Sequence, residues 1–419
     1  MNYKLTVFVA LAFVSLTLQA QNWTEWRGPN GNGTADKGNY PVNFTADDVL
    51  WKAEMPGKGG STPIVWKDRI ILTSGVGEEA EGEDGVLCYN WDGKLLWQTK
   101  LGKQLPGKHK KGTGSNPSAA TDGERLFVLF KSSTAAALDF DGKVLWKTNL
   151  TDTYGEISYF WDLGSSPILV DNKVVFTVMH EGDSYLLALD KVTGKVAWKQ
   201  SRNYECKTES GQSYTTPVVV EEGGRTTLVV WGADHLTGHD AETGKLIWSY
   251  SGFNPTDRPY YRTIASAVVS DGVAVVPFGR GSFLAGMKCS GAIDMTEDDF
   301  MWENKGMGAD VGTPVISDGK IYVVGHIGTV WCVDLQTGKE LWKSEELEGN
   351  GTFFSSPTLA GDKLYAVSDE GAFFVCEATP TGFKVLNKTR FEDDFVATPV
   401  LVRDRLLLRG IKNLYCIEN

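Results

Sequence analysis

The sequence lacks the motifs of several common enzyme classes. No Cys-X-X-Cys or paired Cys/His spacing predicts a zinc site, and no phosphate-binding loop, serine-nucleophile motif or metal-binding helix pattern is present. Basic residues are also few, 41 against 53 acidic ones, which gives a formal net charge of −12. Because nucleic-acid binding depends on clustered Lys and Arg, we expect no nucleic-acid partner.

Long hydrophobic runs are almost absent as well. The main one extends from Leu5 to Leu18, after Lys4 and before the small residue Ala20. It is shorter than the about 20 apolar residues of a membrane span and has the layout of a cleavable secretory signal. We therefore predict a signal peptide over residues 1–20, no transmembrane segment, and an exported protein that is periplasmic or secreted. No Cys stands at position 21, so a lipid anchor is not expected.

Sustained helical periodicity is missing too, and a strand–turn–strand pattern recurs instead. Its clearest copy is ALDKVTGKVAW, in which Asp190 can accept hydrogen bonds from turn amides, Gly194 supplies a positive φ, and Trp198 ends the second strand. Near-copies occupy residues 89–97, 137–146, 238–248 and 332–342. A repeated unit with an unburied Trp is expected to stack against its own copies.

A second signature precedes these hairpins and counts the repeats. It consists of a small or hydroxyl residue, Pro and a β-branched run, and its spacings are 54, 50, 50, 50, 47, 43 and 42 residues. The starts are Pro63, Pro117, Pro167, Pro217, Ala267, Pro314, Pro357 and Pro399. Spacings of this size match four-stranded propeller blades, so we predict an all-β, eight-bladed β-propeller. Because Pro cannot donate to a central strand, each Pro-started strand should be a sheet edge on the central channel.

The last repeat is incomplete, which predicts how the ring closes. After Pro399 the chain supplies three strands and ends at Asn419, whereas Val49 to Lys52 match the strand that precedes each start. The N-terminal strand should therefore complete the last blade and remove the open sheet edge. The predicted organisation is a propeller over residues 48–419, with an N-terminal extension over 21–47 that packs on it through its Trp and Arg residues. We expect a monomer.

The six cysteines are interpreted mainly as core residues. Cys88, Cys332, Cys376 and Cys416 occupy the repeat position that Ala fills in other copies. Cys206 and Cys289 lie in less regular segments, where they could pair or stay free.

The recurring Asp, Gly-Lys and Trp with a Ser-Pro-started strand before them resemble the quinoprotein-type (PQQ-like) propeller repeat, over roughly residues 48–418. The resemblance implies a family that includes PQQ-dependent alcohol dehydrogenases and cofactor-free relatives such as BamB, a scaffold of outer-membrane β-barrel assembly. Those dehydrogenases close the cofactor site with adjacent cysteines, and no two cysteines are adjacent here. We expect no cofactor, with PQQ and calcium left open.

The loops that enter each first strand and the turns between second and third strands should share one propeller face. Aromatic, basic and acidic residues gather there, and such a concavity suits a carbohydrate or a protein segment. The same residue types are ordinary in turns and as channel plugs, and that interpretation stays open. The candidate ligand-binding residues are His109, Trp161, Asp162, His180, Tyr214, Tyr261, Arg262, Arg280, Asp310 and His326.

The pattern favours a binding or scaffold protein that acts through this loop-rich axial face. One alternative is a propeller enzyme that acts on glycans, for example a lyase with His180 or Tyr261 as the base and Arg262 or Arg280 neutralising a substrate carboxylate. A further alternative is a PQQ-dependent oxidoreductase.

Overall fold

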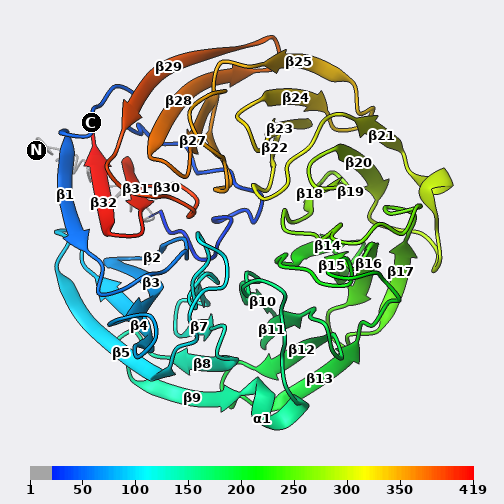
Figure 1. Cartoon of the computed structure of the whole chain (residues 1–419), viewed down its shortest axis with the longest axis horizontal. Helices are drawn as coiled ribbons and strands as arrows, with labels where there is room; N and C mark the ends of the chain where they lie inside the picture. Colours follow the sequence, from blue (N-terminus) through cyan, green and yellow to red (C-terminus); the bar gives the residue numbers. More distant parts are fainter. Residues whose placement is uncertain (1–20) are drawn as a thin grey trace, which may run out of the picture.

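The computed structural model describes residues 21–419, so the predicted signal peptide lies outside the described residues. Eight four-stranded antiparallel sheets surround a central axis (Figure 1), which confirms the predicted eight-bladed propeller. In each sheet the strands follow one another from the axis to the rim, except in the blade that joins the two ends of the chain. Within residues 21–419, no helix has the length and hydropathy needed to cross a membrane.

The strands of blades 1 to 4 run outward from the axis in chain order. Blade 1 holds β2 (Ile64–Trp66), β3 (Arg69–Val76), β4 (Glu83–Tyr89) and β5 (Leu95–Lys103); blade 2 holds β6 (Ala120–Thr121), β7 (Leu126–Leu129), β8 (Thr134–Leu138) and β9 (Val144–Asn149). Blade 3 holds β10 (Ile168–Val170), β11 (Lys173–Val178), β12 (Tyr185–Asp190) and β13 (Val196–Ser201); blade 4 holds β14 (Val218–Glu222), β15 (Arg225–Gly232), β16 (His235–Asp240) and β17 (Leu246–Tyr250). A short helix, α1 (Leu150–Tyr154), follows blade 2.

Blades 5 to 8 repeat the arrangement. Blade 5 holds β18 (Val268–Ser270), β19 (Val273–Phe278), β20 (Phe283–Lys288) and β21 (Trp302–Lys305), with a 3-10 turn at Glu297–Asp299 before β21; blade 6 holds β22 (Val315–Ser317), β23 (Lys320–Val324), β24 (Val330–Asp334) and β25 (Glu340–Ser344). Blade 7 holds β26 (Thr358–Ala360), β27 (Lys363–Val367), β28 (Ala372–Thr379) and β29 (Gly382–Arg390); blade 8 holds β30 (Val400–Val402), β31 (Arg405–Arg409), β32 (Asn413–Glu418) and β1 (Val49–Glu54).

The predicted hairpins join the third and fourth strands. In blade 3 the amides of Val192 and Thr193 donate to Asp190 Oδ1, and Gly194 closes the turn with a φ of 68°. The indole of Trp146 in the preceding blade packs where a Cβ on Gly194 would stand, 2.7 Å from its ring, and its Nε1 donates to the Lys191 carbonyl at 2.9 Å. The hairpin Trp of one blade thus packs against the glycine turn of the next, as the repeat predicts.

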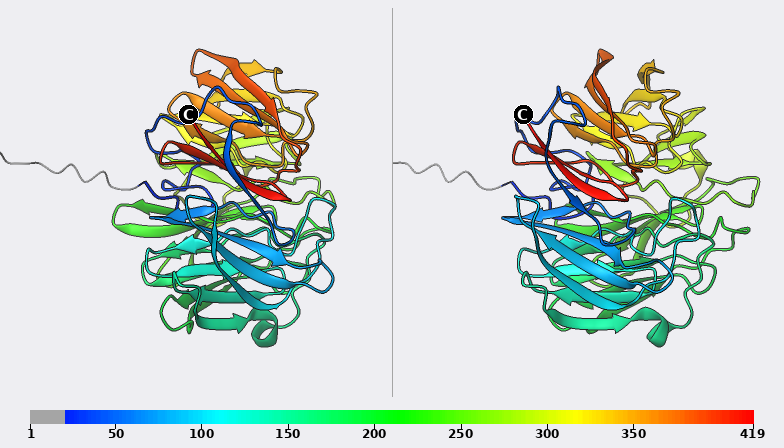
Figure 2. Two further views of the ribbon diagram at one scale, coloured as in Figure 1. Left: turned by 90° about the vertical axis from the view of Figure 1, so that its left-hand side faces the viewer. Right: turned by 60° about the vertical axis from the view of Figure 1, so that its left-hand side comes forward.

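Blade 8 closes the ring with the two ends of the chain (Figures 1 and 2). Strand β1 pairs antiparallel with β32, and Trp51 lies opposite Cys416. Trp51 Nε1 donates to the Trp91 carbonyl of blade 1 at 2.8 Å, which is the same interblade contact that Trp146 makes. The predicted closure by the N-terminal strand is therefore confirmed.

The N-terminal extension crosses the central channel before it reaches β1. Trp23 is 1% exposed and exchanges backbone hydrogen bonds with Val65 of β2, in blade 1. Arg27 donates to the carbonyls of Pro314 and Pro357, which precede the inner strands of blades 6 and 7. The extension therefore spans the axis and is held by blades on both sides of it.

The cysteines at the repeat position are core residues. Cys88, Cys332, Cys376 and Cys416 are fully buried, and each lies opposite a residue of the outer strand. Cys206 and Cys289 are also free thiols, at intermediate and buried positions respectively.

Candidate functional site

A cavity of about 520 Å³ lies on the axis, on the face formed by the entry loops. Its lining comes from the loops that lead into the inner strands of all eight blades and from the turn between β19 and β20. Trp26 of the N-terminal extension also lines it. Because Trp26 also borders the narrow space beside the inner strands of blades 3 to 5, its ring forms the floor of the cavity.

Six of the ten predicted ligand-binding residues line this cavity: His109, Trp161, Asp162, Tyr214, Arg262 and Arg280. The other four, His180, Tyr261, Asp310 and His326, are not among the lining residues.

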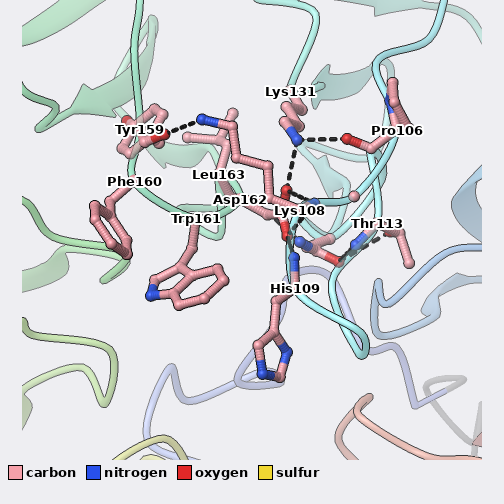
Figure 3. A network of polar contacts seen from close by, with 12 residues as sticks. Pro106, Lys108, His109, Thr113, Lys131, Tyr159, Phe160, Trp161, Asp162 and Leu163 are labelled. Carbon is pink, nitrogen blue, oxygen red and sulfur yellow. Dashed lines mark hydrogen bonds and ion pairs between the residues drawn. The ribbon is translucent and has the colours of Figure 1, made fainter.

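Asp162 organises one wall by holding the entry loop of blade 2 (Figure 3). Its carboxylate accepts hydrogen bonds from the backbone amides of Lys108 and His109 and pairs with Lys131 Nζ at 2.6 Å. The Asp162 and Lys131 side chains are both nearly buried, at 4% and 10% exposure. With its oxygens already occupied, Asp162 is a positioning residue for the loop rather than a free contact for a ligand.

His109 and Trp161 extend from that loop and its neighbour toward the cavity (Figure 3). Their ring centroids lie 5.3 Å apart in an edge-to-face arrangement, and Phe354 continues the row at 6.2 Å from His109. His109 Nδ1 accepts from the Lys111 amide, which leaves the neutral ring with its N–H on Nε2. Burial lowers the pKa of His109, so the ring is neutral near pH 7.

Arg262 lies between two carboxylates on the opposite wall. Its Nε is 3.4 Å from Glu209 Oε1, and its terminal nitrogen is 3.6 Å from Asp310 Oδ2. Asp310 therefore pairs with Arg262 but does not itself line the cavity. Burial raises the pKa of Glu209, although Arg262 and Arg280 oppose the change.

Arg280 extends from the turn between β19 and β20. Its side chain is exposed and forms no ion pair or hydrogen bond with any other residue in the described part of the chain, 21–419. Arg280 has a φ of 57°, in the left-handed region. Its neighbours Gly279 and Gly281 also have positive φ values.

His180 and Tyr261 are turned away from the cavity by local contacts. His180 is buried, and its Nδ1 accepts from the amides of Ser158 and Gly182 while Nε2 contacts the Asp183 carbonyl at 3.2 Å. The Tyr261 hydroxyl lies against Gly279, and its ring lies beneath Arg258. The ring of His326 packs edge-on against Phe354, one layer outside the cavity wall.

Several lining residues of the cavity were not predicted from the sequence, among them Glu209, Tyr260 and Trp26. Glu209 lies in the irregular segment between β13 and β14, where neither composition nor spacing marks it. Tyr260, rather than its neighbour Tyr261, lines the cavity because a φ of 63° turns the backbone at that residue. The two tryptophans of the N-terminal extension indicated packing on the propeller, but no pattern placed Trp26 on the axis.

The donor set does not fit the calcium and quinone cofactor of the dehydrogenases that share this repeat. Among the described residues, no group of three or more His, Cys, Asp or Glu side chains has metal-binding geometry. The six thiols are dispersed over several blades, so the cavity has no adjacent cysteine pair beside it. Two of the three cations at the wall, Lys111 and Arg262, are already paired with protein carboxylates.

The chain is similar to proteins of known families. The family model described as outer membrane protein assembly factor BamB matches residues 42–182 and 82–344. The BamB protein of Yersinia pestis is 23% identical over 332 residues, which cover 76% of this chain and 75% of that protein. A polyvinylalcohol dehydrogenase of a Sphingopyxis species is 25% identical over 265 residues, or 58% of this chain and 36% of its own.

Solved structures agree on the fold. BamB from Moraxella catarrhalis superimposes with a TM-score of 0.64 and 14% identity, over 88% of this chain and 99% of its own. A europium-containing methanol dehydrogenase superimposes with a TM-score of 0.67 and 13% identity, over 94% and 90%. At these identities the likeness concerns the fold alone. With its repeats, its ring closure and a family model that spans most of the propeller, the chain belongs to the BamB family of PQQ-like repeat propellers.

Proposed function

We propose that this is an exported binding protein whose ligand, a short carbohydrate segment, enters the axial cavity from the loop-rich face. The observation that carries the proposal is the cavity itself, about 520 Å³ with aromatic rings along its wall and a Trp as its floor. That volume lies within the range of small-ligand sites. Aromatic rings that stand beside charged groups suit sugar rings, whose faces are apolar and whose edges carry hydroxyls.

A binding role is better supported than catalysis. The two bases expected for a lyase, His180 and Tyr261, do not line the cavity, and both ring nitrogens of His180 are engaged by backbone groups. The relatives named above as assembly factors also favour a protein that binds rather than one that converts a substrate. Export rests on the layout of residues 1–20.

Isothermal titration with a panel of neutral and acidic oligosaccharides tests the proposal. Trp161→Ala should weaken the binding of a positive probe by about 1 to 3 kcal/mol through lost ring contact, with little change in melting temperature. Lys195→Ala and Lys245→Ala, in the hairpin turns of the opposite face, are the controls and should bind as the wild type does. Binding that only the hairpin variants abolish would place the ligand on the wrong face and refute the proposal.

The cofactor expectation has its own test. Purified protein incubated with PQQ and Ca²⁺ should show neither stoichiometric binding nor alcohol-dependent dye reduction, because the cavity has no matching set of carboxylate ligands. Dye reduction with simple alcohols or sugars would contradict this expectation and make the protein an oxidoreductase.

A further inference from the structure

The charges at the cavity wall are compensated by the protein at every position but one. Lys111 bridges the ring and pairs with Asp369 at 3.3 Å and Asp394 at 3.1 Å. Asp162 is neutralised by Lys131, as described above. Each of these charged groups therefore has a counter-ion within the protein, so none of them needs a charged ligand for compensation.

Arg262 and its two carboxylates form a third, looser group. The 3.4 Å approach of Arg262 Nε to Glu209 Oε1 is an ion pair without hydrogen-bond geometry, and neither atom has another hydrogen-bond partner within the described chain. Asp310 Oδ1 is likewise buried and unpartnered there. The Glu209 side chain is only 2% exposed, so its vacant acceptor is costly unless a ligand supplies a donor.

Arg280 is the exception to this compensation. It is the charged side chain at the cavity wall that forms no direct ion pair with any of the described residues. It also stands in a left-handed conformation that L side chains seldom adopt, while Gly281 behind it is packed against the backbone of Ala309 and Asp310. A guanidinium that lines a cavity without a direct ion pair has its donors free for a ligand anion.

Together these groups describe the ligand. We propose, on the basis of the proposed function, that the cavity recognises an acidic sugar. Arg280 takes its carboxylate or sulfate group, Glu209 accepts a hydrogen bond from a neighbouring hydroxyl, and Trp161 and Tyr260 contact the ring. A guanidinium presents two parallel donors that match either anion. The Glu209 carboxylate lines the cavity and needs a hydroxyl donor, which an anionic ligand without hydroxyls would not supply.

Two matched pairs of probes test the inference by titration calorimetry. The first is trigalacturonate and its fully methyl-esterified form, and the second is a sulfated galactobiose and the same disaccharide without sulfate. Wild-type protein should bind the acidic member of at least one pair more tightly, by about tenfold or more, as one charge-assisted hydrogen-bonded contact predicts. A preference in the first pair alone identifies a carboxylate, and a preference in the second alone identifies a sulfate ester.

Arg280→Gln should abolish that preference and leave the affinity for the neutral member unchanged. Arg225→Gln is the control, because Arg225 is an exposed residue of the opposite face and its loss changes the net charge equally. Arg280→Gly should melt no lower than the wild type, because glycine adopts the left-handed conformation without strain. This variant shows that lost acid preference does not come from misfolding.

The outcomes separate the two proposals. Equal binding of acidic and neutral members, reduced by Trp161→Ala, overturns the acidic-sugar inference and leaves the proposed function standing. A preference that survives Arg280→Gln also overturns the inference. Binding of the probes that Trp161→Ala leaves intact overturns the proposed function, and no binding of either member of both pairs overturns both.

Discussion

At the residue scale, Asp162 shows how one buried carboxylate determines the position of a whole loop. It accepts from two consecutive amides of the 106–113 segment and pairs with Lys131, while His109 extends from that same segment into the cavity (Figure 3). The sequence predicted Asp162 as a ligand contact because it lies in a loop that enters the first strand of a blade. The structure instead makes it the support on which His109 depends.

Replacing Asp162 by Ala should lower the free energy of unfolding by about 3 kcal/mol, because Lys131 would be left as a buried charge without a partner. Urea denaturation measures the change, and amide hydrogen exchange should show faster exchange in residues 107–113. Asp394→Ala is the control: Asp394 also pairs with a cavity lysine but is 54% exposed, so the loss should be below about 1 kcal/mol. Equal losses in the two variants would contradict the assigned role.

His239 predicts a pH dependence of stability. It occupies, in blade 4, the position that Leu138 and Leu189 fill in blades 2 and 3, and burial lowers its pKa to about 4. The unfolded state, with an ordinary histidine pKa near 6.5, binds a proton as pH falls below about 6.5 while the folded state does not. Stability is therefore fully present above the unfolded pKa and is lost as pH falls toward about 4.

The expected loss from this group is about 3 kcal/mol between pH 7 and pH 4. Urea midpoints measured across that range should fall less steeply for His239→Leu than for the wild type. Since other groups titrate in the same range, the difference between the two curves is the measurement. Parallel curves would show that His239 has the same pKa in the folded and unfolded states, and would contradict this prediction.

At the element scale, the hairpin between the third and fourth strands joins neighbouring blades. Gly194 has a φ of 68°, and an added Cβ would lie 2.7 Å from the Trp146 ring. Gly223 has a similar φ of 59°, but an added Cβ there would meet nothing within 4 Å. The two positions thus separate backbone strain from the loss of interblade packing.

Gly194→Ala should destabilise the protein by about 2 to 4 kcal/mol, because strain and a displaced Trp add together. Gly223→Ala should cost only about 1 kcal/mol, from strain alone. Thermal or urea unfolding of both variants gives the difference. Equal effects would show that the Trp146 contact contributes little to the joint between blades 2 and 3.

These elements also explain which features the sequence could predict. The hairpin is a local structure, in which Asp190, Gly194 and Trp198 act within eleven residues, so its repetition predicts the number of blades and the closure by β1. The cavity depends on contacts between distant segments. Glu209 is positioned by Arg262, and Trp26 by the inner strands of blades it does not precede. Spacing carries no information on such contacts, so the loop face was predicted but its individual lining residues only in part.

At the scale of the whole molecule, the N-terminal segment performs two tasks in succession. Residues around Trp26 and Arg27 close the channel on the axis, and β1 then completes the rim of blade 8. Both the floor of the cavity and the integrity of the ring therefore depend on the first part of the described chain.

Deleting residues 21–52 should destabilise the ring by more than about 3 kcal/mol, since it removes the buried Trp23 and the half-buried Trp51 and exposes the edge of β32. The truncated protein should melt lower and associate, as calorimetry and size-exclusion chromatography would show against the chain that begins at Gln21. A truncated protein that stays monomeric and melts like that control would refute closure by β1.

The pairing of β1 with β32 also governs the order of events during biosynthesis. Strand β1 is synthesised first, but its partner β32 is synthesised last. Blades 1 to 7 therefore have time to form while β1 has no partner. Contacts between such distant parts of a chain form slowly, and ring closure should therefore be the late, rate-limiting step of refolding. During that interval the chain presents an open β-edge, and the demand for a chaperone should be greatest just before the C-terminus emerges.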